Sequence, residues 1–253
     1  MKVSIITITR NNAAGLRRTI DSVASQRHVN TLEHIIVDGD STDNTPEIIA
    51  AAPTHPVVTS QTPRGVYNAI NAGLSLATGD IVGLLHAGDV FSDRHVLDDV
   101  CSAFRENPGT DFIFGDVHFA VPGGRVARYY SAEICSPENI PSGIYPPHPS
   151  LYMRRHVHEK VGFYDDSFIS AGDFEMFIRL FCKNDFNWLY LPRDMVCMQP
   201  GGVSSTLYYR LIGNNRERLH ALRQNGIKPS YIRLFPHYIH AFKSYLWRHP
   251  RKK

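Results

Sequence analysis

The most constraining feature of this sequence is the stretch from Gln61 to Asp89, which passes from a loop into a helix, a buried strand and an acidic turn. Apolar residues between Val66 and Ala77 recur at three- and four-residue spacing, which predicts the apolar face of a helix beginning near Gly65. The following run, 81–85, is short and continuously apolar, as expected of a central strand covered on both faces. Asp89 then lies just past the carboxyl end of that strand, where α/β sheets bind ligands.

The same order of strand, polar loop and helix occurs twice before this stretch. A β-branched run over 3–8 leads into Thr9 and a helix, and a second strand over 34–37 leads into Asp38 and a helix near Pro46. A third short strand covers 57–60. This alternation predicts an α/β fold with a doubly wound, mostly parallel sheet, whose first half, residues 1–116, binds a nucleotide.

The second half, residues 117–227, has a different pattern with more turns and prolines, and we expect it to form the acceptor side of the site (the acceptor-side half). We expect a hairpin whose turn is Pro122-Gly123-Gly124, and a Pro-rich segment over 136–149 that forms one wall of the site. The other expected elements come in this order: a helix over 96–104, a strand over 112–114, a helix over 173–183, paired strands over 188–191 and 195–198, and a loop at Gly201-Gly202.

Composition restricts the class of protein. The 253 residues contain no low-complexity linker, so one domain over 1–227 is expected, and a net charge of +3 is too small to indicate nucleic-acid binding. Cys101, Cys135, Cys182 and Cys197 have no metal-binding spacing, which indicates reduced thiols in a cytoplasmic protein. No run resembles a cleaved signal or a membrane span.

Several motifs together resemble glycosyltransferase family 2 of the GT-A fold. The segments that carry the resemblance are VSIITITRNN (3–12), VDGDSTDNT (37–45), RGVYNAINAGLSLATGD (64–80), the turn ending at Asp89, PPHPSLY (146–152) and AGDFEMFIR (171–179). The resemblance implies one inverting transfer of a sugar from a nucleotide sugar, a UDP-sugar by expectation, to a hydroxyl of a glycan or lipid-linked glycan. It also implies cell-surface polysaccharide synthesis in a bacterium.

The acidic turn is the expected metal site. Asp89 is assigned as the ligand of Mg²⁺ or Mn²⁺, because a departing nucleoside diphosphate develops negative charge that such a cation neutralises. The family usually has two adjacent acids in this turn, and here Gly88 takes the first position, so we expect the ribose contact to be lost or supplied by water. His86 is a possible donor contact, although a lone histidine is usually structural.

Three residues are assigned to the nucleotide. The resemblance implies that Asp38 accepts a hydrogen bond from the base and that the loop around Thr9 forms the other side of that pocket. Arg64 stands just before a helix, where its paired donors suit a diphosphate. The alternatives are that Asp38 only shapes an Asp-Gly turn and that Arg64 is a solvated surface charge.

Asp173 and Glu175 are the candidate general bases. Residues two apart on a helix point away from each other, so only one of them can face the acceptor. We choose Asp173, because the helix start favours its ionised form and it matches the family's base, while an N-cap role is the alternative. Glu175 then supports the site, and His148, between two prolines, is a possible acceptor contact.

The tail over 228–253 combines an apolar pattern with positive charge. Its apolar residues at helical spacing are Tyr231, Leu234, Phe235, Tyr238, Ile239, Phe242, Tyr245 and Leu246. Pro236 should kink or interrupt this helix, and no acid follows Glu217. We expect a peripheral contact with the inner face of the cytoplasmic membrane, and the alternative is that the apolar stripe packs on the domain.

Two other functions stay open from the sequence alone. A nucleotidyltransferase that makes sugar nucleotides would also use a doubly wound nucleotide-binding half, but the glycine-rich basic loop after its first strand is missing here. A non-catalytic glycan-binding protein is suggested by Gly88 and opposed by the presence of both Asp89 and Asp173.

Overall fold

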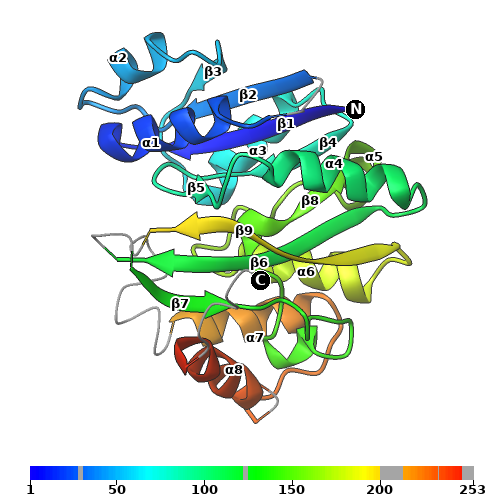
Figure 1. The fold of residues 1–253 in the computed structure, drawn as a ribbon. Coiled ribbons are helices and arrows are strands. Elements are labelled where there is room, and N and C mark those ends of the chain that lie inside the picture. Colours follow the sequence, from blue (N-terminus) through cyan, green and yellow to red (C-terminus); the bar gives the residue numbers. More distant parts are fainter. Residues whose placement is uncertain (28–30, 122–124, 200–212, 233, 247–253) are drawn as a thin grey trace.

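The computed structural model describes residues 1–27, 31–121, 125–199, 213–232 and 234–246 (Figure 1). The expected turn at 122–124 and the loop at Gly201-Gly202 lie outside these residues. One sheet runs through the protein in the order β3-β2-β1-β4-β8-β6-β9-β5, and β7 pairs with β6.

The first half of the sheet is parallel, as predicted. Its four strands are β1 (Lys2–Thr9), β2 (Thr31–Asp38), β3 (Val57–Ser60) and β4 (Ile81–Leu84). The central strand β1 pairs in parallel with β2 on one side and with β4 on the other. All four residues of β4 are buried, which confirms that it is a covered central strand.

The second half of the sheet mixes both directions. Its strands are β5 (Val90–Phe91), β6 (Phe112–Ala120), β7 (Val126–Tyr130), β8 (Tyr152–Arg154) and β9 (Trp188–Met198). β8 pairs antiparallel with both β4 and β6, whereas β9 is parallel to β6. Residue 116, our predicted boundary between the two halves, lies inside β6, so the halves share one sheet.

Two expectations about these strands are wrong. The strand expected over 112–114 continues into the hairpin as the single strand β6, and the pair expected over 188–191 and 195–198 is the single strand β9. β6 shifts its register against β9 between Phe114 and Val117. These irregularities let one strand continue where the sequence suggested a break.

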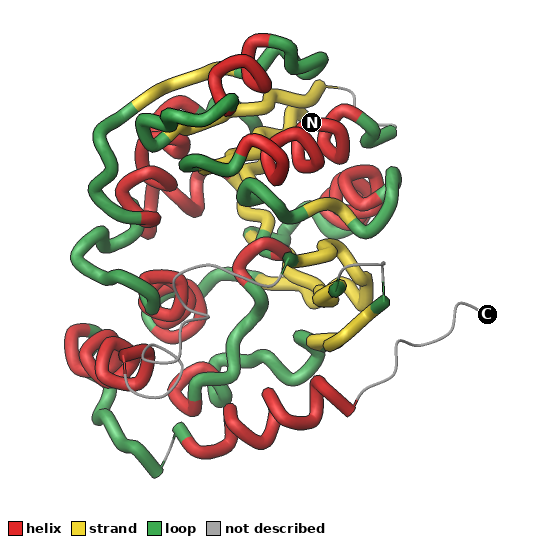
Figure 2. Tube along the Cα trace, turned by 90° about the vertical axis from the view of Figure 1, so that its left-hand side faces the viewer, coloured by secondary structure: helices red, strands yellow, loops and turns green. Residues whose placement is uncertain are grey.

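Helices cover both faces of the sheet (Figures 1 and 2). Val3 and Ile5 of β1 belong to the core that includes α4, whereas Ile6 belongs to the core that includes α3 and α6. This alternation explains why the buried strands are apolar on both faces. The helices are α1 (Ala13–Ala24), α2 (Thr45–Ala50), α3 (Val66–Leu76), α4 (Val96–Glu106), α5 (Arg155–Val161), α6 (Gly172–Cys182), α7 (Asn214–Gln224) and α8 (Phe235–Leu246).

The Pro-rich segment forms no strand or long helix, as predicted. It contains two short 3₁₀ turns, η1 (Ile140–Ser142) and η2 (His148–Ser150). Pro236 lies in the first turn of α8, so it starts this helix and does not interrupt it as we expected, because the first turn needs no N–H from proline. Within its described residues, the protein has no helix long and apolar enough to span a membrane.

Close packing between α3 and β1 generates the first prediction. A Cβ atom built at Gly73 would lie 2.3 Å from Cγ2 of Ile6, whereas a Cβ at Gly109 would meet no atom within 4 Å. Gly73→Val is therefore expected to lower the free energy of unfolding by about 2–3 kcal/mol through overpacking. Gly109→Val is the matched control in urea unfolding, and equal effects of the two substitutions would contradict this view of the packing.

Candidate active site

The carboxyl ends of β1 and β2 bring two predicted nucleotide residues side by side. Thr9 and Asp38 are register partners across the parallel pair, and both are buried. The Asp38 carboxylate accepts hydrogen bonds from the Ser41 backbone N–H at 3.2 Å and from the Ser41 hydroxyl. The Thr9 hydroxyl oxygen is buried and has no partner among the described residues. Asp38 thus shapes its loop, and the contact of either residue with a nucleotide stays a prediction.

The acidic turn after β4 is fixed by side chains from α1. The Thr19 hydroxyl accepts the Gly88 N–H at 3.0 Å and donates to the Asp89 carbonyl oxygen at 2.8 Å. Asn12, which caps α1, donates from its side chain to the Ala87 carbonyl at 3.0 Å. The turn therefore has a defined position relative to β1 and α1.

Gly88 has a backbone conformation that explains its identity. Its φ angle is +111°, a region that side chains with a Cβ rarely adopt. Space does not exclude a side chain here, because the nearest atoms to an added Cβ are 3.7 Å away. Backbone conformation, rather than crowding, thus disfavours an acid at position 88.

Asp89 is a buried carboxylate, and few groups of the protein stabilise its ionised form. Its Oδ1 accepts the Gln199 N–H at 3.0 Å, and burial raises the pKa of Asp89 to about 7. A nearby cation would favour the ionised form. No three His, Cys, Asp or Glu side chains gather as a metal cluster within the described ranges. A single carboxylate still fits Mg²⁺ or Mn²⁺, since such ions at phosphate sites take most ligands from phosphate and water.

A row of rings connects the acidic turn to the helix that carries Asp173. The His86 ring lies 5.9 Å from the His148 ring, and His148 Nε2 is 2.8 Å from the Tyr164 hydroxyl. Tyr164 in turn stacks on Tyr67 at 5.9 Å. Burial lowers the pKa of His86 to about 4 and that of His148 to about 3, so both are neutral at pH 7. His86 Nδ1 is buried without a partner in the described structure.

Asp173 stands at the end of this row, in the first turn of α6. The Tyr67 ring packs on Gly172, where an added Cβ would meet ring carbons at 2.8–2.9 Å. Ala171 is the N-cap of α6, so the alternative that Asp173 is the N-cap is wrong, although Asp173 Oδ1 accepts the Phe174 N–H of the first turn at 2.7 Å. Burial raises the pKa of Asp173 to about 6, which suits a general base near neutral pH.

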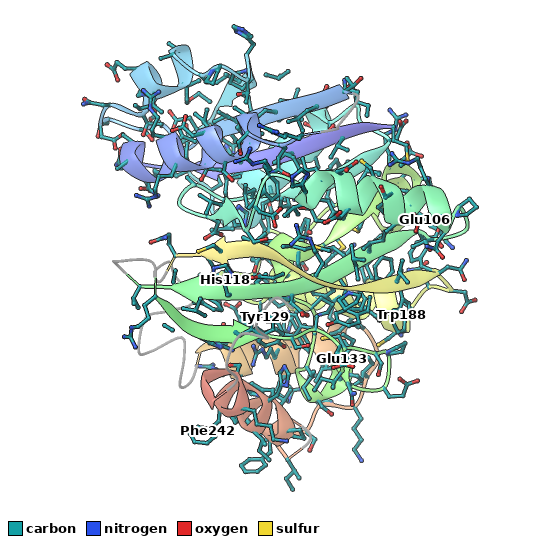
Figure 3. All side chains as sticks on the ribbon, viewed as in Figure 1. Glu106, His118, Tyr129, Glu133, Trp188 and Phe242 are labelled. Carbon is teal, nitrogen blue, oxygen red and sulfur yellow. The ribbon has the colours of Figure 1, made fainter. Side chains whose placement is uncertain are left out.

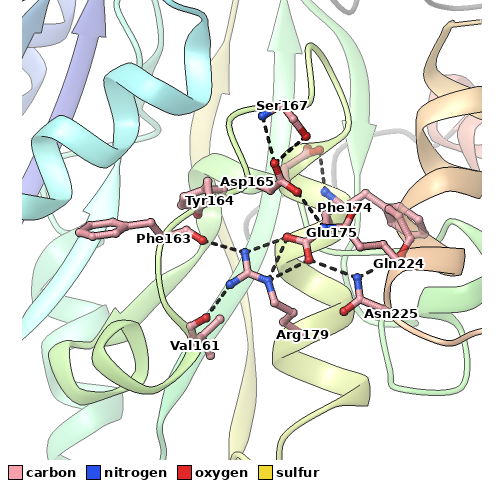
Figure 4. Close-up of polar contacts among 12 residues, drawn as sticks. Val161, Phe163, Tyr164, Asp165, Ser167, Phe174, Glu175, Arg179, Gln224 and Asn225 are labelled. Atoms are coloured by element: carbon pink, nitrogen blue, oxygen red, sulfur yellow. Dashed lines mark hydrogen bonds and ion pairs between the residues drawn. The ribbon is translucent and has the colours of Figure 1, made fainter.

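Glu175 is occupied by structural contacts (Figure 4). Its carboxylate accepts bonds from Arg179 Nε at 2.9 Å and Nη2 at 2.7 Å, and Arg179 also donates to the carbonyl oxygens of Val161 and Phe163. Asn225 of α7 donates to the same carboxylate at 3.1 Å. Glu175 therefore ties α6 to the loop after α5 and to the end of α7.

Arg64 is exposed directly before Gly65 and α3. No carboxylate lies within 4.0 Å of it in the described residues. Its proposed role at the diphosphate and the alternative of a solvated charge therefore both remain.

Comparison with known proteins identifies the family. Residues 4–181 match the family described as "Glycosyl transferase family 2". The chain belongs to this family. The match covers well over half of the sequence and includes the acidic turn, the row of rings and most of α6.

Curated relatives of this family 2 chain are also glycosyltransferases. It is 30% identical over 183 residues to an uncharacterized glycosyltransferase of Mycobacterium tuberculosis, covering 70% of this chain and 68% of the relative. It is 31% identical over 210 residues to the PGL/p-HBAD biosynthesis glycosyltransferase of Mycobacterium bovis, covering 81% and 79%.

Solved structures confirm the predicted GT-A fold of the family 2 chain. TarS of S. aureus superposes with a TM-score of 0.66 at 19% identity, over 88% of this chain but only 40% of TarS. Glucosyl-3-phosphoglycerate synthase of Mycobacterium tuberculosis gives a TM-score of 0.63 at 17% identity, over 90% and 81%.

Two residues that support the site of this family 2 chain were absent from the sequence-based predictions. Thr19 holds the acidic turn, and Glu217 of α7 accepts the N–H groups of Ser170 and Ala171, just before α6, at 2.9 and 2.8 Å. The partners of Thr19 are 69 and 70 residues away in the sequence, and those of Glu217 are 46 and 47 residues away. No local pattern marks such contacts, so the sequence carried no signal for them.

Proposed function

We propose that this protein is an inverting glycosyltransferase that moves a sugar from a nucleoside diphosphate sugar to a hydroxyl of a glycan or lipid-linked glycan. The observation that carries the proposal is the continuous row of rings between the acidic turn at Asp89 and the partly buried carboxylate of Asp173. We propose that the donor nucleotide sugar and the acceptor glycan both bind along this row. His86 and His148, neutral and directed along it, are proposed to contact sugar hydroxyls.

In the proposed reaction, Asp173 takes the proton of the acceptor hydroxyl while the oxygen of that hydroxyl attacks the anomeric carbon of the donor sugar. The bond from that carbon to the diphosphate oxygen breaks in the same step, which inverts the configuration. Asp89 would hold a divalent cation, which when bound neutralises charge on the diphosphate. Arg64 contributes positive charge to the same group, so positioning and electrostatics provide most of the rate gain.

The donor pocket is assigned to Thr9 and Asp38. The unpartnered Thr9 hydroxyl can donate a hydrogen bond to a base, and the adjacent Asp38 carboxylate can accept one from it. TarS has been crystallised with UDP-GlcNAc, and the mycobacterial synthase with UDP and Mn²⁺, which supports a UDP-sugar here. The relative named for PGL/p-HBAD biosynthesis supports a role in glycolipid or polysaccharide synthesis, and we propose that this synthesis serves the cell surface.

The outer face of α8 supports contact with a membrane. Leu234 is buried, whereas Phe235, Tyr238, Ile239 and Phe242 are 43–66% exposed and recur at helical spacing. Figure 3 shows Phe242 on the outer side of α8. Polar contacts attach the inner face, including a hydrogen bond from Arg128 to Ser244 and a contact of the His240 ring with the Tyr130 ring at 4.7 Å.

The sequence of the tail adds the charge that an anionic bilayer attracts. Lys228 and Lys243 lie in the described part, and Arg233, Arg248, Arg251, Lys252 and Lys253 lie outside it, as do the side chains of Tyr245 and Leu246. No acid opposes these charges after Glu217, and each basic residue near such a surface adds about 1 kcal/mol. We propose that α8 rests on the inner leaflet with its aromatic face inserted.

Metal dependence is tested with Asp89→Asn, which keeps an oxygen to accept the Gln199 N–H but removes the charge. We expect loss of Mn²⁺ binding in calorimetry and loss of nucleoside diphosphate release from a panel of nucleotide sugars. Asp21→Ala, an exposed acid on α1, is the control. Full turnover of wild-type protein in chelator would refute the assignment, and pyrophosphate release would instead indicate a nucleotidyltransferase.

The general base is tested with Asp173→Asn, which should lower turnover by about 10²–10⁴ with little change in donor affinity. Wild-type turnover should fall with unit slope below about pH 6, the pKa of Asp173. The titratable groups that interact with this carboxyl are Arg218, which is charged, and Tyr67, Tyr145 and Tyr164, whose raised pKa values keep them neutral.

Measuring the free energy of unfolding at two pH values distinguishes a general-base role of Asp173 from a helix-capping role. Because folding raises the pKa of Asp173 from 3.8 to about 6, its ionisation opposes folding above pH 6 and not below pH 3.8. Asp173→Asn should therefore be the more stable protein at pH 7.5, with the difference vanishing near pH 4. A slow Glu175→Gln variant beside a nearly normal Asp173→Asn would show that the base is misassigned.

Membrane contact is tested with the combined substitution Phe235→Ser, Ile239→Ser and Phe242→Ser, which changes only exposed side chains. We expect at least tenfold weaker cosedimentation with phosphatidylglycerol vesicles and unchanged activity on a soluble acceptor. Val57→Ser with Val58→Ser, exposed on edge strand β3, is the control. Equal vesicle binding by the substituted protein would exclude α8 as the contact.

A further inference from the structure

Arg218 of α7 is a cation with incomplete compensation inside the acceptor-side half. One of its Nη atoms donates to His237 Nε2 at 3.0 Å, and the other donates to the Tyr145 hydroxyl at 3.3 Å. Its guanidinium carbon lies 5.6 Å from the Tyr145 ring centroid and 5.9 Å from that of Phe174. The third nitrogen of the guanidinium, Nε, is buried and has no partner within the described residues.

No carboxylate side chain pairs with this arginine. Every Asp and Glu of the sequence lies in the described ranges, and none comes within 4.0 Å of Arg218. By contrast, Arg179 and Arg193, which are also largely buried, each have a carboxylate partner at 2.6–2.7 Å. A partly desolvated cation without an anion costs free energy that a bound anion would recover.

The arginine is close to the proposed base. The Tyr145 ring, over which its guanidinium lies, is 5.3 Å from the ring of Phe174, the residue after Asp173. Burial raises the pKa of Asp173, and the charge of Arg218 acts against that rise, so the two groups interact electrostatically. His237, whose pKa burial and the same charge lower to about 4, is neutral and accepts a hydrogen bond from the arginine.

We propose that Arg218 binds a phosphate group of a substrate beside Asp173, an inference that rests on the proposed transfer reaction. A guanidinium presents paired donors that match two phosphate oxygens, and Nε with one Nη atom forms such a pair. The phosphate has two possible sources, the diphosphate of the donor or a phosphate carried by the acceptor. Contacts to His237 and Tyr145 orient the group for either.

The test is calorimetric titration of wild type, Arg218→Gln and Arg218→Lys with three probes: UDP, uridine, and inorganic phosphate in saturating UDP. Weakening of UDP binding by at least tenfold, with uridine binding unchanged, would assign the site to the donor diphosphate. Unchanged UDP binding with at least tenfold weaker phosphate binding would assign it to an acceptor phosphate. Arg223→Gln, an exposed arginine on the same helix, is the control.

Unchanged binding of all probes by folded Arg218→Gln would overturn the inference and leave Arg218 as a clamp between α7, α8 and Tyr145. If Arg218→Gln fails to fold, Arg218→Lys decides, because lysine keeps the charge but lacks the paired donors. If Arg218→Lys binds all three probes with wild-type affinity, the inference is overturned as well. The transfer reaction is judged separately from turnover of Asp173→Asn, so either proposal can fail alone.

Discussion

The pairing of β1 with both β2 and β4 is the constraint on which the rest of the structure depends. Because the three strands are parallel, their carboxyl ends meet at one edge of the sheet. Thr9 and Asp38 become neighbours there, and the acidic turn with Asp89 comes directly after β4 in the chain. Thr19 and Asn12 of α1 then hold that turn, so the strand order and the following helix together position the carboxylate.

The acceptor-side half depends on buried ion pairs and capping bonds rather than on strand ends. Glu175 and Arg179 hold the loop after α5, while Glu217 accepts N–H groups just before α6. These contacts leave Asp173 as the acid of α6 that is free for chemistry. Burial raises its pKa, so the packing that fixes the helix also prepares the proposed base.

The C-terminal helix α8 has two faces with different surroundings. Its inner face contacts β7 through Ser244 and His240, and through His237 it reaches Arg218 of α7. Its outer face carries exposed aromatic side chains. The alternative that the apolar stripe packs on the domain thus holds for Leu234 and is wrong for the four exposed residues of α8. A bilayer contact through this helix would lie close to the proposed acceptor side, which suits a lipid-linked substrate.

The sequence by itself determined the parallel half, the helix 66–76, the buried strand 81–84 and the candidate acids, because short-range periodicity and strand-end position encode them. It failed at β6 and β9, where register shifts extend strands through residues typical of turns. It also gave no sign of Thr19, Glu217 or Arg218. Only the tertiary structure decided these, since their contacts join distant segments and depend on burial. Burial likewise decided which face of α8 meets solvent.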